Sequence, residues 1–465
     1  MATQRLASWA KSLEYSDLPD EVVRAAVRSF YNWAGCAIGG STHPATTIAQ
    51  YQTLHPLFGP PTASLLGHKE PLKADPQHAA LINGIASHVH DYDDTHLDTI
   101  IHPTGPVASA LLAVAEWKKG VTGKDLIVAL VVGIEAECKV GLAVWPEHYD
   151  VGWHITSSTG SIGAAVAVSK ILNLSTPETA HAIGLAATQV VGLREMFGSH
   201  TKSFHPGRAA QSGLLAAIMA QGGYTSSEQA LEAKRGWANV VSSPKTDVQQ
   251  RLANFIGIPS GSQASTLGLA STEAGRWEVL RNSFKPFPCG IVIHPIIDAC
   301  AQLNNEMFQK RLELADIKAI TAKVHPLVLE LTGKRTPKDG LEAKFSVFHS
   351  GACGLIFGKV TPSEYKDSVV LSDEVITVRD LIQAEIDPAL TADQAIVTLA
   401  LTDGQTLEKH VKHAVGSIDV PMDDAMLQKK FLGQVSKVLS NAEAASKALW
   451  ELESMDDVSA IASFR

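Results

Sequence analysis

The feature that most limits what this chain can fold into is a succession of helical patterns, rich in small residues, between Asp20 and about Gly236. Apolar residues recur there at helical spacing, and few segments alternate as a strand would. Predicted helices cover residues 21–38, 76–90, 107–119, 123–144, 161–172, 176–191 and 207–222. Several are apolar on nearly all sides, which is typical of helices at the centre of a large helical domain. Aromatic residues make up only 6% of the chain, so the packing must rest on small side chains.

The pattern changes after about Arg276. Three strand-like runs follow at 317–324, 396–400 and 406–411, and two helical patterns at 294–309 and 341–357. The last two strands flank Asp403-Gly404, which is a strong hairpin signal. We therefore predict a mainly α protein with a large all-helical domain over residues 1–274, a smaller α+β domain over 275–412, and C-terminal helices over 413–465 that return to the helical domain.

Charge and composition exclude several classes of protein. Lys and Arg total 39 against 48 Asp and Glu, a net charge of −9, so a nucleic-acid partner is not expected. The longest apolar run, residues 126–134, is far shorter than the ~20 residues of a membrane span, so no membrane partner is expected. Five scattered cysteines form neither a disulfide framework nor a zinc pattern, and the first 20 residues do not resemble a secretory leader. We predict a cytoplasmic protein, with a mitochondrial address as the alternative.

The densest polar cluster lies within the helical part, from His88 to Asp98, and His102 follows it. Asp91 and Thr95 are four residues apart, so a continuing helix would place them on one face. One alternative is a solvated loop that caps helices. Another is a divalent metal site made by a His-x-His pair and carboxylates, although nothing in the spacing fixes a ligand set. We predict no metal.

Three histidines stand before helices rich in glycine and alanine: His102, His154 and His205. Helix N-termini carry unpaired N–H groups and a dipole that favours anions. Lys202 and Arg208, near the third histidine, add positive charge. Together these segments favour a polyanionic substrate such as a small carboxylate. The alternative for each histidine is a helix cap or a hydrogen bond within the core.

A fourth segment, Phe284-Lys-Pro-Phe-Pro-Cys289-Gly290, opens the α+β domain. Its Lys285 could face the same cleft, because ligand pockets are common at domain boundaries. The alternative is a surface lysine beside a rigid turn. Cys289 has no identifiable partner that would make it a nucleophile, so we expect an inert thiol.

These segments resemble motifs of the MmgE/PrpD family. The matching residues are Asp91-Tyr-Asp-Asp-Thr95 with His102-Pro103, Gly152-Trp153-His154, Thr201-Lys202 with His205, Lys285-Pro-Phe-Pro288 and Gly340-Leu-Glu-Ala-Lys-Phe345. They occur in the family's order and cover almost the whole chain. The resemblance implies a helical domain formed by both chain ends and an α+β lid inserted before the C-terminal helices. It also implies a homodimer and no metal or organic cofactor.

The family's branches, which include 2-methylcitrate dehydratase, cis-aconitate decarboxylase and iminodisuccinate epimerase, share the activation of a carbon next to a carboxylate. Carried over from the decarboxylase branch, the site comprises Asp91, Thr95, His102, His154, Lys202 and Lys285. Two positions depart from that branch. Leu329 stands where it has a lid tyrosine, and Gly290 where it has a histidine.

We therefore predict a cofactor-independent lyase that acts on a small di- or tricarboxylate, nearer a dehydratase than a decarboxylase because of the two departures. The predicted catalytic residues are His102, His154, Asp91, Thr95 and Lys202, and the predicted substrate-binding residues are Lys285, His205 and Arg208. His102 and His154 are the candidates for proton transfer. The alternatives are a dicarboxylate epimerase or isomerase, and a carboxylate-binding protein without activity.

Overall fold

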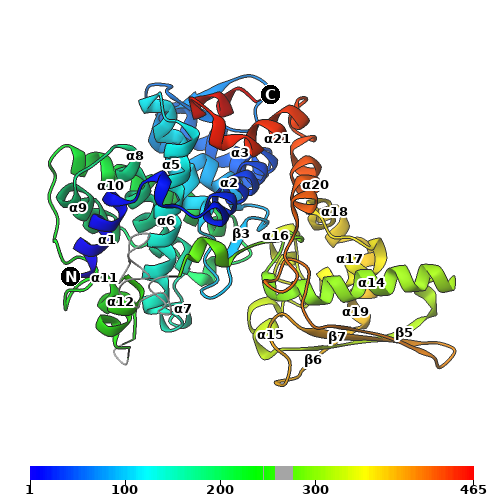
Figure 1. Cartoon of the computed structure of the whole chain (residues 1–465). Helices are drawn as coiled ribbons and strands as arrows, with labels where there is room; N and C mark the ends of the chain where they lie inside the picture. The colour runs from blue at the N-terminus through cyan, green and yellow to red at the C-terminus, as the bar shows by residue number, and fades with distance from the viewer. Residues whose placement is uncertain (244–245, 257–275, 465) are drawn as a thin grey trace.

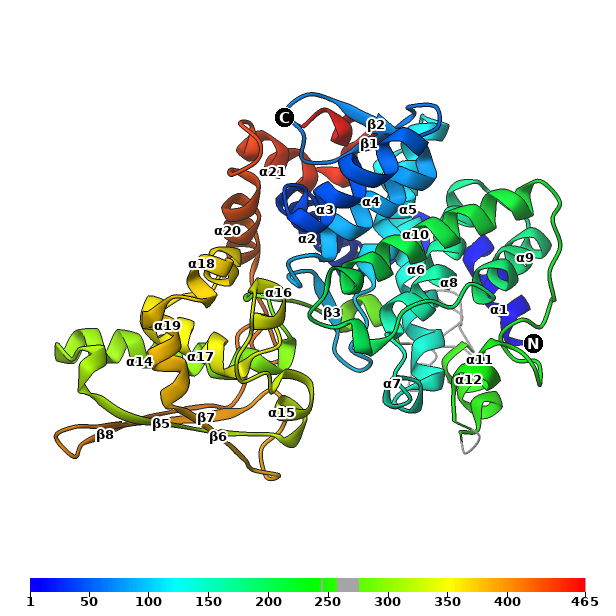
Figure 2. The same ribbon diagram turned by 180° about the vertical axis from the view of Figure 1, so that it is seen from behind.

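The computed structural model describes residues 1–243, 246–256 and 276–464. It confirms the mainly α fold with a smaller α+β part. Figures 1 and 2 show a helical body on one side and, on the other, a lid formed by α14–α19 and β5–β8. The predicted boundary between residues 274 and 275 lies outside the described residues.

The helical body consists of α1 (Ala2–Ser12), α2 (Asp20–Gly40), α3 (Pro44–Thr47), α4 (Pro76–His88), α5 (Thr104–Lys118), α6 (Gly123–Val144), α7 (Glu147–Asp150), α8 (Ile155–Ile171), α9 (Thr176–Ala187), α10 (His200–Gln221), α11 (Trp237–Val241) and α12 (Val248–Ile256). Helices α5, α6 and α8 are buried on nearly all sides, as their apolar patterns predict. Local sequence signals determine where several of these helices begin. Asp75 caps α4, and the Thr122/Asp125 and Ser175/Glu178 capping boxes begin α6 and α9.

Three predictions about the body were wrong in detail. It is not wholly helical, because β1 (Ala63–Leu65) pairs with β2 (Leu72–Ala74). Helix α8 begins six residues before the predicted start at 161, at Ile155. Helix α10 begins at His200, seven residues before the predicted start at 207, and continues through Pro206. A proline removes only one backbone hydrogen bond from a helix, and packing against neighbouring helices can outweigh that loss. His205 therefore lies within a helix and not before it.

Helices α4 and α10 cross with their backbones in contact. A Cβ atom added to Gly84 would lie 2.5 Å from the Cα atom of Gly207, and one added to Gly207 would lie 2.3 Å from the Leu81 carbonyl oxygen. Only glycine permits this approach. Because α4 ends at His88 and α10 carries Lys202, the crossing sets the separation of two residues of the candidate site.

We expect Gly84→Ala to lower the free energy of unfolding by about 1–3 kcal/mol, because the added methyl group forces two backbones apart. The matched control is Gly433→Ala in another helix, where nothing lies within 4 Å of an added Cβ atom. It should raise stability by about 0.5–1 kcal/mol through helix propensity. Urea denaturation of both variants measures the difference. Equal midpoints for the two variants would contradict a close α4–α10 crossing.

The lid holds a four-stranded sheet covered by helices. The strands are β5 (Ile317–Val324), β6 (Ile382–Ile386), β7 (Ala395–Leu401) and β8 (Thr406–Val411), and the helices are α14 (His294–Lys310), α15 (Pro326–Thr332), α16 (Gly340–Ala343), α17 (Val347–Phe357), α18 (Asp367–Val370) and α19 (Asp373–Leu381). Strand order is β6-β5-β7-β8, with only β5 and β6 parallel. Helices α14, α17 and α19 lie along one face of the sheet (Figure 1).

The predicted hairpin at Asp403-Gly404 is confirmed, since it joins β7 and β8 and Gly404 has a φ of 88°. Two other features differ from prediction. Strand β6 was missed, and residues 341–357 form two helices and not one, with a break between α16 and α17. One local signal and one set of long-range contacts accompany the break. Ser346 caps α17, and Lys344 donates hydrogen bonds to the His90 and Pro288 carbonyls, at 2.9 Å each.

The C-terminal helices α20 (Asp424–Val435) and α21 (Ala442–Trp450) pack on the helical body (Figures 1 and 2). The Tyr31 ring of α2 stacks on Phe431 and Trp450 with centroid distances of 4.5 and 4.3 Å. A second link between distant segments is the antiparallel pairing of β3 (Asp94–His96) with β4 (Asn282–Phe284). This ladder brings the polar cluster to the first residues of the lid.

Within the described ranges, no helix combines the length and the apolar character that crossing a bilayer requires.

Candidate active site

A small cavity lies where the lid meets the helical body. Its charged and aromatic walls include Asp91, His102, Tyr149, His154, Lys202 and Lys285, and lid residues such as Leu331 and Phe345 also line it. The cavity has a volume of only about 40 Å³, whereas ligand pockets typically measure about 300–1,000 Å³. In this conformation it is too small to hold a tricarboxylate.

Asp91 stands between two lysine side chains. Its Oδ1 atom accepts hydrogen bonds from Lys285 Nζ at 2.7 Å and from Lys202 Nζ at 3.1 Å. Burial would raise the pKa of Asp91, but the two ammonium groups outweigh it and hold that pKa well below the ordinary value. Both ammonium groups also line the cavity, so they can bind the carboxylates of an anionic ligand.

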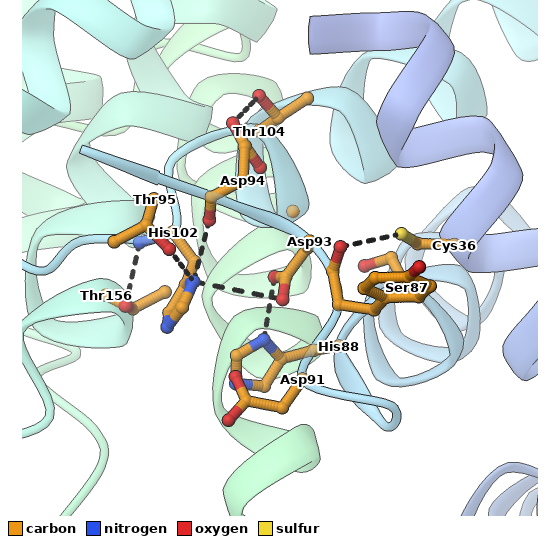
Figure 3. A network of polar contacts seen from close by, with 12 residues as sticks. Cys36, Ser87, His88, Asp91, Asp93, Asp94, Thr95, His102, Thr104 and Thr156 are labelled. Atoms are coloured by element: carbon orange, nitrogen blue, oxygen red, sulfur yellow. Dashed lines mark hydrogen bonds and ion pairs between the residues drawn. The ribbon is translucent and has the colours of Figure 1, made fainter. Parts of the chain in front are cut away.

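His88 and Asp93 extend this group, and the predicted site did not include them. His88 Nδ1 lies 2.7 Å from Asp93 Oδ2, and His88 Nε2 lies 2.9 Å from Lys202 Nζ. Figure 3 shows His88 and Asp93 facing each other beside Asp91. Both side chains are fully buried. We infer that they position Lys202. The sequence signal was the unusual density of ionisable residues in this segment, which did not show which of them meet in space.

His102 has one ring nitrogen fixed and the other left for a ligand. Its Nδ1 atom donates to the Asp94 carbonyl at 2.7 Å, with Thr95 Oγ1 at 3.3 Å and Asp93 Oδ1 at 3.8 Å (Figure 3). A carbonyl oxygen only accepts, so Nδ1 carries the proton and Nε2 is the basic atom. Burial lowers the pKa of His102 to about 3, so the imidazole is neutral at neutral pH.

His154 forms a pair with His205. It occupies the N-cap position of α8 without a side-chain capping hydrogen bond, and its Nδ1 lies 2.9 Å from His205 Nδ1. A single proton can sit on either of these nitrogens. Depending on where it sits, His154 Nε2 presents a proton or a lone pair to the cavity. Burial lowers the pKa of both residues, that of His205 to about 3. His205 does not line the cavity and stands behind His154 as a positioning residue.

Two other predicted residues lie outside the cavity wall. Thr95 is buried on β3 behind His102 and contacts its ring. It does not share a helical face with Asp91, because α4 ends at His88 and Asp91 takes a φ of +50°. Arg208 bonds to Gln211 one turn along α10, at 2.6 Å, and does not line the cavity.

The lid contributes a lysine and an apolar cover. Lys285 follows β4, is 1% exposed and also donates to the Asp91 and Cys289 carbonyls at 3.3 and 3.2 Å. Phe197 and Phe345 stack on each other at 5.4 Å, and Lys202 Nζ lies 5.3 and 5.6 Å from their ring centres.

Three lid positions singled out in the sequence are placed by the structure. Leu329 packs against the lid core, and Leu331 reaches the cavity in its place, with Gly290 nearby. Burial raises the pKa of Cys289 to about 12, as expected of an inert thiol and not of a nucleophile.

Tyr149 is a further cavity residue that sequence reasoning missed. It lies on α7, is 5% exposed and packs against Trp145 at 5.3 Å. Arg194 holds it from behind, with the guanidinium 4.0 Å from the ring centre and a 3.0 Å hydrogen bond to the Tyr149 carbonyl. Burial raises the pKa of Tyr149 to about 12, so its hydroxyl keeps its proton and can donate to a substrate oxygen.

The histidine cluster also has the spacing of a metal site. Ligand atoms of His88, His102 and His154 lie within 4.8 Å of one another. However, both nitrogens of His88 are engaged, by Asp93 and Lys202, and two ammonium groups already face Asp91. A cation added beside these ammonium groups would be repelled. The donor set therefore suits a bound anion better than a metal ion.

Comparison with known proteins identifies the family. Residues 4–250 match the MmgE/PrpD N-terminal domain, and residues 287–454 match the MmgE/PrpD C-terminal domain. The chain therefore belongs to the MmgE/PrpD family. It is 26% identical to human cis-aconitate decarboxylase over 474 residues, which cover 99% of this chain and 93% of that protein. It is 30% identical to Aspergillus terreus cis-aconitate decarboxylase over 50% of this chain and 48% of that protein. Salmonella typhimurium 2-methylcitrate dehydratase is 25% identical over 82% of this chain and 79% of its own length.

Proposed function

We propose that the protein is a lyase that acts on a small tricarboxylate by proton transfer at a carbon next to a carboxylate. The arrangement that carries the proposal is the Lys202–Asp91–Lys285 group opposite the basic Nε2 atom of His102. The ammonium groups bind carboxylates, and they stabilise the negative charge that develops when the neighbouring carbon loses a proton or carbon dioxide.

His102 is the proposed base or acid at carbon. In dehydration, His102 Nε2 takes a proton from the carbon, and the hydroxyl group on the adjacent carbon leaves as water after protonation by His154. In decarboxylation, the bond to the carboxylate breaks, carbon dioxide leaves, and the carbanion takes the Nε2 proton of the His102 imidazolium, which returns to the neutral imidazole and is reprotonated by solvent. Asp93, 3.8 Å from His102 Nδ1, stabilises the imidazolium that forms.

The relatives decide which reaction to test first. In the sequence, Leu329 and Gly290 favoured dehydration because they depart from the decarboxylase branch. In the structure, however, Leu329 does not reach the cavity. Proteins named cis-aconitate decarboxylase match 99% of the chain, and those named 2-methylcitrate dehydratase match up to 84%. We therefore propose decarboxylation of cis-aconitate as the first candidate and dehydration of 2-methylcitrate as the second.

Proton NMR in D₂O on cis-aconitate, 2-methylcitrate, citrate and iminodisuccinate tests the proposal. Itaconate from cis-aconitate supports decarboxylation. A new vinylic product that keeps all its carboxylates supports dehydration. Deuterium exchange or inversion without loss of a group would replace the lyase with an epimerase. Tight binding without turnover on every compound would replace it with a carboxylate-binding protein.

For dehydration, in which His102 acts as a base, the rate should depend weakly on pH across the neutral range. The base must be unprotonated, and the pKa of His102 near 3 leaves it so throughout. Lys202 must be protonated, and burial lowers its pKa from the ordinary lysine value, so activity is lost on the alkaline side. We therefore expect kcat/KM to be nearly flat through the neutral range and to fall at higher pH. An inflection near pH 6.5 that disappears in His102→Asn would contradict this.

Tyr149→Phe removes the hydroxyl and keeps the ring that packs on Arg194. We expect kcat/KM to fall by about 10–100-fold, because one hydrogen bond to a charged substrate oxygen is lost. The matched control is Tyr224→Phe, an exposed tyrosine outside the cavity. Steady-state kinetics of the two variants measure the effect, and equal kcat/KM values would remove Tyr149 from the site.

A further inference from the structure

A second and much larger cavity, of about 650 Å³, lies at the junction of lid and body. Its walls come from the start of α3, the end of α4, the start of α10, and from α16, α18 and α20. In both views α16 and α18 lie where the lid meets α20 (Figures 1 and 2). We call this cavity the junction chamber. Its volume is in the range of ordinary ligand pockets.

Basic side chains gather on the walls of the junction chamber, namely His43, His90, His200, Lys344, Lys366 and Lys437. Two acidic residues also line it, but their carboxylates accept backbone hydrogen bonds. Asp339 accepts from the Glu342 N–H at 2.9 Å, and Asp367 accepts from the Gly340 N–H at 2.8 Å. Of the three lysines, none forms an ion pair with a carboxylate among the described residues.

Two polar atoms of the wall have no partner in the part of the chain that the structure describes. His43 Nδ1 accepts from the Ala45 N–H at 3.1 Å, so its proton is on Nε2, which donates to no described group. Gln434 is 5% exposed, and its Oε1 atom is buried without a hydrogen bond. The half-buried Nε2–H group of His43 can therefore donate to an anionic oxygen of a ligand in the chamber.

The junction chamber and the catalytic cavity share three segments of chain. His90 adjoins Asp91, His200 lies two residues before Lys202, and Lys344 adjoins Phe345. Lys344 also spans the junction, since it donates to the His90 carbonyl of the body at 2.9 Å. Burial lowers the pKa of Lys344 to about 7, although the Asp91 carboxylate acts in the opposite direction.

We propose that the junction chamber is a second anion site, which binds a small molecule with two or more carboxylate or phosphate groups and thereby holds the lid against the body. Lys344 and Lys366 of the lid and Lys437, two residues after the end of α20, bind the anionic groups. Lys437 Nζ already reaches the lid at Ser363 Oγ, at 3.4 Å. The proposal does not depend on which reaction the catalytic cavity performs.

Calorimetric titration of the full chain with pyrophosphate and with citrate tests the proposal of an anion site. The probe that binds more tightly shows whether phosphate or carboxylate groups are preferred. We expect Lys366→Ala/Lys437→Ala to weaken binding by about tenfold or more, since two ion pairs are lost. Lys359→Ala/Lys429→Ala is the charge-matched control, because these exposed lysines lie in the lid and on α20 but outside the chamber. It should bind as the unaltered chain does.

Two further measurements separate the chamber from the catalytic cavity and from a structural role. Lys202→Met should leave pyrophosphate binding unchanged. Hydrogen exchange across residues 340–370 should slow when pyrophosphate binds. Loss of binding in Lys202→Met but not in the Lys366/Lys437 double variant would assign the anion to the catalytic cavity and overturn the proposal. Absence of binding by both probes, or unchanged exchange in the lid, would also overturn it.

Discussion

His102→Asn is expected to lower kcat by about 10²–10⁴-fold, the contribution of a general acid or base. The asparagine side chain can still donate to the Asp94 carbonyl, which His102 Nδ1 now does at 2.7 Å. The fold of the segment is therefore kept, and only the basic nitrogen is lost. Steady-state and single-turnover kinetics measure the change, and denaturation midpoints show that the variant is folded.

His55→Asn is the matched control for this experiment. His55 is exposed and lies outside the catalytic cavity. It should keep the kcat of the unaltered chain. If His102→Asn retains more than about half of that kcat, His102 does not transfer a proton in the slow step.

Lys202→Met is expected to lower kcat/KM by about 10²–10³-fold, because a buried ammonium group that binds a substrate carboxylate is lost. It should also lower stability by about 1–3 kcal/mol, because Asp91 then keeps only Lys285 as a charged partner. Methionine fills the volume of the lysine stem. Kinetics and denaturation of the same preparation measure both effects.

A second variant separates catalysis from stability. Lys202→Arg keeps a positive charge beside Asp91, so we expect stability to recover while kcat/KM stays low, because a guanidinium does not place its charge where the ammonium group does. Lys310→Met, an exposed lysine of α14, is the matched control and should change neither. Recovery of both stability and kcat/KM in Lys202→Arg would mean that the position needs only a positive charge and not the lysine ammonium group.

The sequence was most informative about elements with long periodic patterns. The start and end of α6 and the β7–β8 hairpin were correctly predicted, because capping boxes and Asp-Gly turns are local signals. The early start of α10 was missed, because the α4–α10 crossing at Gly84 and Gly207 is a contact between distant segments. Strand β6 was missed for a related reason, since only its pairing with β5 makes it a strand.

For the candidate site, too, local motifs were informative and contacts between distant segments could not be predicted. The motifs indicated Asp91, His102, His154, Lys202 and Lys285, and all five line one cavity. The residues behind the wall were assigned less well. His205 positions His154, Thr95 contacts the back of the His102 ring, and Arg208 does not face the cavity.

Two residues of the site have no sequence signal that separates them from their neighbours. His88 lies in the polar cluster, but only the fold shows that it joins Asp93 to Lys202. Tyr149 comes from a four-residue helix, and its place in the cavity depends on Arg194, 45 residues further along the chain. Their partners are long-range, and single-sequence patterns do not record such contacts.

The most direct test of the central claim is a crystal structure of His102→Asn with cis-aconitate bound. We predict that substrate carboxylates contact Nζ of Lys202 and of Lys285, with the reacting carbon facing residue 102. The cavity, now about 40 Å³, should be enlarged by movement of the lid. A ligand whose carboxylates contact neither lysine, or whose reacting carbon faces away from residue 102, would contradict the account.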